Sequence, residues 1–215
     1  MSTINLFFTY GLIASGALPV LAYLTLPKSG KEQVSKLIIA WFATRVLADA
    51  TSYIAYQNQL NIYPIFHVSV FIEFSLMMLY FVKFKQWMHK PMGWMLLSIP
   101  LLAFLGEIFF VDSIFSLNQI SLTVNYLVIA LLFLTLIMHP SKLDKKQLVI
   151  ILIFFLYHAF LVVYGVFQTE LRANPDLFKF IYPYFWTANS AFNLFFAYYF
   201  WTFGKLEVGS IQKTT

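Results

Sequence analysis

The segment WFATRVLADATSY (residues 41–53) lies in a long apolar stretch, yet it carries Arg45 and Asp49 four residues apart. On a helix these two opposite charges lie one turn apart on one face, close enough to neutralise each other. A charged side chain at the centre of a bilayer costs roughly 2.5–3.5 kcal/mol on insertion scales, so such residues normally turn toward the bundle interior and pair. The pair therefore fits either a structural contact or a functional site.

Two stripes of polar and aromatic residues extend this pattern. On residues 36–56, Arg45 and Asp49 are followed at helical spacing by Ser52 and Tyr56. A second stripe with helical spacing lies near the carboxyl end of the chain and consists of Tyr182, Trp186, Asn189 and Asn193.

The depth of each polar group follows by counting from its predicted membrane boundary. Arg45 and Glu73 come out near mid-membrane, and the other groups come out in the outer half, namely Asp49, His67, Glu107, Asn125, His158 and Asn189. Costly ionisable groups at one depth favour a site over helix-packing hydrogen bonds, which contribute only about 0.6 kcal/mol each. We predict an outward-facing, aromatic-lined pocket with the ligand-binding residues Asp49, His67, Asn125, His158, Trp186, Asn189 and Asn193. Its predicted floor is an ion-pair network of Arg45, Asp49 and Glu73.

The composition indicates that these residues lie in a membrane. Of the 215 residues, 60% are hydrophobic and only 11% are charged, against roughly 25% charged residues in soluble domains. A spanning helix needs about 20 mostly apolar residues, and seven stretches have that length: 5–26, 36–56, 62–82, 92–111, 119–138, 148–167 and 180–203. We predict an all-α polytopic membrane protein, with seven transmembrane helices in a single domain that fills residues 1–215.

The basic residues predict the orientation. The loops after the first, third and fifth stretches and the tail carry Lys28, Lys31, Lys36, Lys83, Lys85, Lys90, Lys142, Lys145, Lys146, Lys205 and Lys213. The opposite loops, 57–61, 111–118 and 168–179, carry only Arg172 and Lys179. Because cytoplasmic loops are enriched in Lys and Arg, the amino terminus is predicted outside and the carboxyl terminus inside. Four tryptophans fall near the predicted inner boundary, as an interfacial belt does: Trp41, Trp87, Trp94 and Trp201.

A weak internal similarity relates the two halves of the chain. IYPIF (62–66) opens the third stretch and IYPYF (181–185) opens the seventh, and YF recurs at the same offset at 80–81 and 199–200. This pattern indicates a parallel repeat of three plus one plus three helices. Chance matching between aromatic-rich helices is the alternative.

The candidate residues match no common catalytic or metal-binding motif. The chain has no cysteine, which excludes disulfides, thiolate metal sites and cysteine nucleophiles. Asp49, His67, Glu107 and His158 are of metal-ligand type, but no two have a short ligand spacing such as HxxxH. Ser-His-Asp catalysis has no nucleophile elbow to support it. We predict no metal, no cofactor and no catalytic residue, while His67 or His158 could act as a pH-dependent switch.

The predicted topology is similar to two known families. Microbial rhodopsins hold retinal on a lysine in the middle of the seventh helix, where this chain has Trp186, Asn189 and Asn193, so retinal is not expected. The order of three plus one plus three helices is similar to that of the SWEET sugar facilitators. Their paired asparagines fit Asn189 and Asn193, but the repeat-equivalent positions here are Val70 and Phe74.

Three segments carry a further resemblance: TRVLADATSYIAY (44–56), FHVSVFIEF (66–74) and YFWTANSAFNLFFAYYF (184–200). They resemble uncharacterised seven-helix inner-membrane proteins of Bacteroidota-type bacteria, over most of the chain. Proteins of that group are often encoded beside two-component signalling genes, so the resemblance implies sensing.

We therefore predict a multi-pass inner-membrane receptor or sensor-like protein for a small ligand or pH. Its predicted partners are the lipid bilayer and that ligand, with no nucleic acid. A signalling protein is also predicted as a partner, because the tail after Phe203 is too short for a signalling module of its own. The first alternative is a small-solute transporter or facilitator that uses the same cavity. The second is an intramembrane enzyme, which needs His67 or His158 within hydrogen-bond reach of Asp49 or Glu107.

Overall fold

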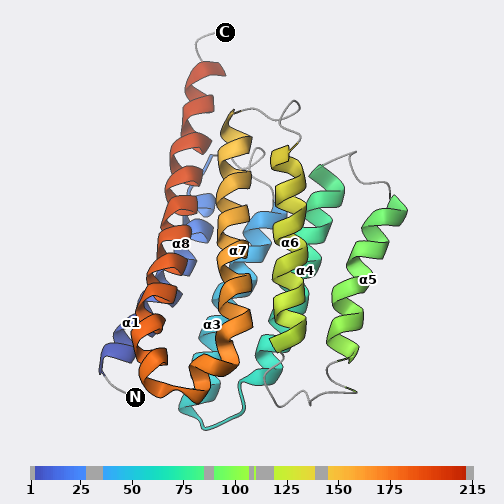
Figure 1. Cartoon of the computed structure of the whole chain (residues 1–215). Coiled ribbons are helices and arrows are strands. Elements are labelled where there is room, and N and C mark those ends of the chain that lie inside the picture. Colours follow the sequence, from blue (N-terminus) through green and yellow to red (C-terminus); the bar gives the residue numbers. More distant parts are fainter. Residues whose placement is uncertain are drawn as a thin grey trace. The chain divides into compact units, whose positions relative to one another are not determined.

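The computed structural model describes residues 3–27, 36–84, 90–106, 109, 119–138 and 145–211. Within these ranges the chain is helical apart from short turns and contains no β-strand (Figure 1). The helices are α1 (Thr3–Leu24), α3 (Lys36–Gln57), α4 (Tyr63–Phe84), α5 (Lys90–Gly106), α6 (Gln119–Met138), α7 (Lys145–Ala173) and α8 (Pro175–Ile211). Each predicted apolar stretch overlaps one of these helices, so the all-α prediction is confirmed for the part of the chain described.

Several helices have the character of membrane spans. By length and composition, four could cross a bilayer: Lys36–Gln57, Tyr63–Phe81, Ile120–Met138 and Gln147–Gln168, with a shorter apolar helix at Thr9–Leu24. Large apolar side chains project from them, and Leu47 and Ile54 of α3 are 64% and 60% exposed. Such exposure is unfavourable in water but ordinary against lipid tails. The molecule is therefore a helical, membrane-embedded protein.

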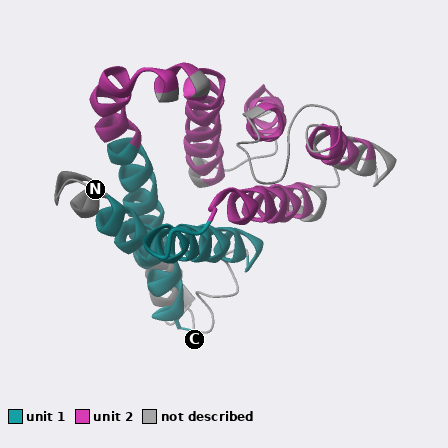
Figure 2. Cartoon of the chain, turned by 90° about the horizontal axis from the view of Figure 1, so that it is seen from below, with its two compact units in different colours: residues 1–60, 186–215 teal, residues 61–185 magenta. Residues whose placement is uncertain are grey.

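The chain divides into two compact units (Figure 2). Unit 1 comprises residues 1–60 and 186–215, and thus α1, α3 and the part of α8 from Trp186 onward. Unit 2 comprises residues 61–185, and thus α4, α5, α6, α7 and the first turns of α8. Within each unit, helices that follow one another in sequence run in opposite directions (Figure 1), as successive membrane passes do.

Aromatic rings form the core of unit 1. Phe192, Phe196 and Phe200 recur every four residues, so they lie on one face of α8. They pack on Phe42 of α3, whose ring centre lies 5.9, 5.4 and 6.2 Å from theirs. Trp41, expected in an interfacial belt, is instead 1% exposed and contacts Phe42 and Phe192. Its indole belongs to this core because the neighbouring helices offer it aromatic edges.

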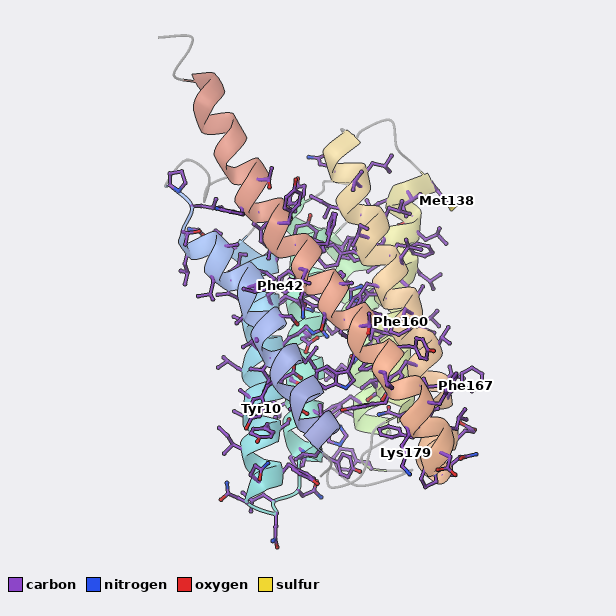
Figure 3. The ribbon with its side chains drawn as sticks, turned by 90° about the vertical axis from the view of Figure 1, so that its left-hand side faces the viewer. Tyr10, Phe42, Met138, Phe160, Phe167 and Lys179 are labelled. Atoms are coloured by element: carbon purple, nitrogen blue, oxygen red, sulfur yellow. The ribbon has the colours of Figure 1, made fainter. Side chains whose placement is uncertain are left out.

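The core of unit 2 is centred on α6 and α7. The rings of Phe133 and Phe154 stack at 5.0 Å, and both side chains are fully buried. The first part of α8 joins this unit through Phe185, which stacks on Tyr164 of α7 at 3.9 Å and on Phe160 at 5.8 Å. Phe160 therefore faces α8, whereas Phe167 lies on the surface of α7 with 55% exposure (Figure 3).

The predicted loop over residues 168–179 is wrong, because only Asn174 interrupts the helices there. The Asn174 side-chain oxygen accepts a hydrogen bond from the Leu177 amide at 3.1 Å, as an N-cap residue does. Pro175 follows at the first helical position and Asp176 at the second, both favourable at a helix start. Strong capping allows the chain to turn sharply from α7 into α8 without a loop. The prediction missed this because a count of apolar residues detects only the part of each helix that faces lipid.

The end of α3 is a Schellman motif. The Leu60 amide donates to the Ala55 carbonyl at 2.9 Å and the Gln59 amide to the Tyr56 carbonyl at 3.0 Å. Gln59 has a φ of 59°, a left-handed conformation that normally favours glycine at this position.

We expect Gln59→Gly to raise the free energy of unfolding, by up to about 1 kcal/mol, because glycine adopts this conformation without the Cβ penalty. Thermal unfolding of the purified protein in detergent measures the change. Gln57→Gly, in the last turn of α3, is the control and should lower stability. A loss of stability for Gln59→Gly would contradict the geometry.

Candidate functional site

Arg45 lies near the middle of α3 and reaches across to α8. Its Nη2 donates a hydrogen bond to Oδ1 of Asn189 at 2.9 Å. Its guanidinium carbon lies 4.9 Å from the centre of the Trp41 ring, one turn earlier on α3, in a cation–π contact. Because Asn189 is 1% exposed and Trp41 is buried, these contacts hold the charge against the protein interior.

Asp49 and Ser52 continue the Arg45 face of α3 toward its carboxyl end. Asp49 is partly buried, and its carboxylate is attracted electrostatically by Arg45. Ser52 is 7% exposed, and its buried hydroxyl has no hydrogen-bond partner among the residues that the structure describes. Tyr56, the last member of the predicted stripe, is 52% exposed and lies on the surface.

A second group of polar contacts joins α8 to α1. Asn193 Nδ2 donates to the Ser15 hydroxyl at 3.2 Å. That hydroxyl donates to the Leu12 carbonyl at 3.0 Å and lies 3.4 Å from the Ser190 hydroxyl. A methyl group on the neighbouring Gly16 would come within 3.1 Å of Val46 Cγ2, so α1 approaches α3 closely here. We call the polar residues of this region the unit 1 polar cluster: Ser15, Arg45, Asp49, Ser52, Asn189, Ser190 and Asn193.

Unit 1 thus brings together part of the predicted pocket. Arg45, Asp49, Asn189 and Asn193 all belong to the unit 1 polar cluster, and Trp186 is buried one turn before Asn189 on α8. The sequence did not single out Ser15 and Ser190, or the acceptor role of Asn189. One signal for Ser15 was available, because it lies in the small-residue run ASGA (14–17), and small residues mark close helix contacts in membranes.

His158 and His67 belong to unit 2. His158 is fully buried, and its Nδ1 lies 2.8 Å from the Phe154 carbonyl oxygen. Since a carbonyl can only accept, Nδ1 carries a proton in this contact. The ring is surrounded by Tyr126, Phe133 and Tyr157, with ring centres 6.1, 5.8 and 5.4 Å away.

The remaining predicted site residues also lie in unit 2. His67 is 4% exposed, and its ring lies edge-on to Phe104 of α5 at 6.0 Å. Glu73 of α4 is buried, and so is Asn125 of α6, whose Oδ1 has no hydrogen-bond partner within the described ranges.

The metal and enzyme alternatives depend on residues that the structure describes only in part. Among the residues described, no three His, Cys, Asp or Glu side chains form a group that could hold a metal. The enzyme alternative invoked Glu107, which lies outside the described residues, as do most of the lysine-bearing loops. The unit 1 polar cluster, in contrast, combines a cation, a carboxylate, amides and hydroxyls from three helices.

No protein-family model, curated protein or solved structure matches the chain.

Proposed function

We propose that the protein is a seven-pass inner-membrane receptor that recognises a small ligand through the unit 1 polar cluster and signals through a partner protein. Its amino terminus faces outward and its carboxyl terminus inward. The alternating helix directions within each unit and the sorting of lysines in the sequence support this topology. The sequence resemblance to proteins encoded beside two-component signalling genes supports a sensing role.

The hydrogen bond from Arg45 to Asn189 carries the proposal. A neutral helix-packing bond in a membrane contributes about 0.6 kcal/mol, whereas an arginine at the centre of a span costs roughly 2.5–3.5 kcal/mol. Even with the Asp49 carboxylate nearby, a guanidinium that bonds to the Asn189 amide costs more to place in a span than such a bond returns, so it is a poor choice for packing alone. Its charge and its fork of donors suit the recognition of a polar ligand.

The unit 1 polar cluster also offers a way to transmit occupancy. Its contacts join α1, α3 and α8, so a ligand that contacts Arg45 competes with, or reinforces, the bonds between these helices. A ligand shifts a conformational equilibrium by its difference in affinity for the two states. Helix movement of this kind is the signal that we propose is passed to the partner.

Binding and transport assays on the purified protein test this function. The probes are sugars, organic acids, amines and amino acids, applied separately to protein in detergent and to proteoliposomes. We expect one class to raise the unfolding temperature of the wild type and not of Arg45→Gln, without uptake above protein-free liposomes. Uptake of the bound class would identify a transporter. If Arg45→Gln bound the same probe as tightly as the wild type does, the unit 1 polar cluster would not be the ligand-binding site.

A further inference from the structure

The hydroxyl of Ser52 differs from other hydroxyls of its helix. Thr44 and Thr51, also on α3, donate to the carbonyls of Ala40 and Leu47 one turn back, at 2.9 and 2.6 Å. The Ser52 hydroxyl is buried and makes no such bond within the described part of the chain. A buried polar atom without a partner is destabilising, which is why such atoms in native proteins call for a ligand, a water or a functional reason.

The charges beside Ser52 restrict what could satisfy it. Arg45 and Asp49 supply one positive and one negative charge, and their side chains leave α3 roughly 6 Å apart. In a medium of low dielectric constant, an added anion would leave this pair with a net negative charge, and an added cation with a net positive one. A ligand that carries both charges leaves the site neutral, so it is the charged ligand whose burial is least unfavourable.

We infer that the unit 1 polar cluster binds a zwitterion of the α-amino acid class; this rests on the proposed function. The ligand carboxylate is placed at the guanidinium of Arg45 and the amide nitrogen of Asn189, whose oxygen already accepts from Arg45. The ligand ammonium is placed at the carboxylate of Asp49 and the hydroxyl of Ser52. The two ligand groups are joined through one carbon and therefore fit between side chains one helical turn apart.

Binding of intact and blocked amino acids to the purified protein in nanodiscs tests the inference. The probes are the standard amino acids, their N-acetyl forms, their methyl esters, and simple carboxylic acids and amines, at up to about 10 mM to include weak receptors. We expect at least one amino acid to bind. Its N-acetyl form lacks the ammonium and its methyl ester lacks the carboxylate, so each should bind at least about tenfold more weakly, because an ionic group of the site is left unpaired.

Variants of α3 assign the two ends of the ligand. Ser52→Ala should weaken amino-acid binding by roughly tenfold, the effect of one hydrogen bond to a charged group, without lowering the unfolding temperature of the unliganded protein. Thr51→Ala removes a neighbouring, exposed hydroxyl that is bonded within its own helix, and should leave affinity unchanged. Asp49→Asn should reduce the preference for amino acids over the matching carboxylic acids.

The outcomes separate this inference from the proposed function. If carboxylic acids or amines bind as tightly as amino acids, the ligand is not a zwitterion, but the proposed receptor function is not contradicted. The same conclusion holds if only sugars bind in an Arg45-dependent way. Unchanged affinity in Ser52→Ala overturns the assigned geometry. Absence of Arg45-dependent binding by every probe class overturns both proposals.

Discussion

Gly165→Ala is expected to destabilise the protein, and a second change, Thr123→Ala, is expected to restore most of the loss. A Cβ at position 165 would lie 2.7 Å from the Thr123 hydroxyl oxygen, closer than real Cβ contacts come. Overpacking of this kind costs about 1–3 kcal/mol, partly offset by the higher helix propensity of alanine. Thr123→Ala removes the colliding atom, after which the nearest neighbour is Leu122 Cδ2 at an ordinary 3.4 Å.

Unfolding of the single and double variants in detergent measures this coupling as a double-mutant cycle. Thr123→Ala alone should change stability little, because its buried hydroxyl has no hydrogen-bond partner among the residues described. Gly11→Ala is the matched control, since a Cβ there meets nothing within 4 Å and should be neutral or stabilising. If Gly165→Ala behaved like Gly11→Ala, or the double variant were no more stable than Gly165→Ala, then α6 and α7 would not approach each other here as described.

The sequence predicted the helices well where lipid-facing apolarity decides their extent. The predicted stretches 36–56 and 119–138 match α3 and α6 to within one residue. The prediction failed at the corner between α7 and α8, where Asn174 and Pro175 set the boundary by capping. Helix ends outside the hydrocarbon depend on backbone hydrogen bonds, which a count of apolar residues does not detect.

The sequence could predict which residue types belong to the candidate site, but not which residues contact one another there. Buried charge is costly, so Arg45 and Asp49 stood out from the sequence alone. That Arg45 bonds to Asn189, at a sequence separation of 144, depends on how the helices pack and has no local signature. The sequence placed Ser52 in a polar stripe, but only the structure shows that its buried hydroxyl has no hydrogen-bond partner within the described ranges. Gly165 carries no signal in the sequence, and its role follows from the short distance to Thr123.

Asn189→Leu is expected to destabilise the protein more than Arg45→Met does, although the two residues form one hydrogen bond. Asn189→Leu removes the acceptor and keeps the guanidinium in place, and the loss of a hydrogen bond to a charged group costs about 2–3 kcal/mol. Arg45→Met removes the bond and the charge together, and the long apolar side chain retains contact with Trp41. Because it would otherwise leave the Asp49 carboxylate without its countercharge, every protein in this comparison also carries Asp49→Asn, the reference included. We therefore expect Arg45→Met to cost about 1 kcal/mol or less.

In the Asp49→Asn background, the Arg45→Met, Asn189→Leu combination should be more stable than Asn189→Leu, because no guanidinium is left without its acceptor. The coupling energy of this cycle is expected to be at least about 1 kcal/mol, above the 0.6 kcal/mol average for hydrogen bonds in membrane helices. The hydrogen bond of 2.7 Å between Tyr10 and Tyr53 joins α1 and α3 at an exposed position and is the neutral control. Tyr10→Phe and Tyr53→Phe should couple more weakly than the Arg45 pair.

The order of these effects decides between a structural and a functional Arg45. If the arginine serves packing, Arg45→Met should be as destabilising as Asn189→Leu, because each removes the same contact between α3 and α8. If it serves a ligand, Arg45→Met in the Asp49→Asn background should fold nearly as stably as Asp49→Asn alone. In the otherwise unchanged protein, Arg45→Met should fail to bind the probe that stabilises the wild type. In that case Arg45, which contacts Trp41 and Asn189, would be a side chain that the fold does not need and that ligand binding explains.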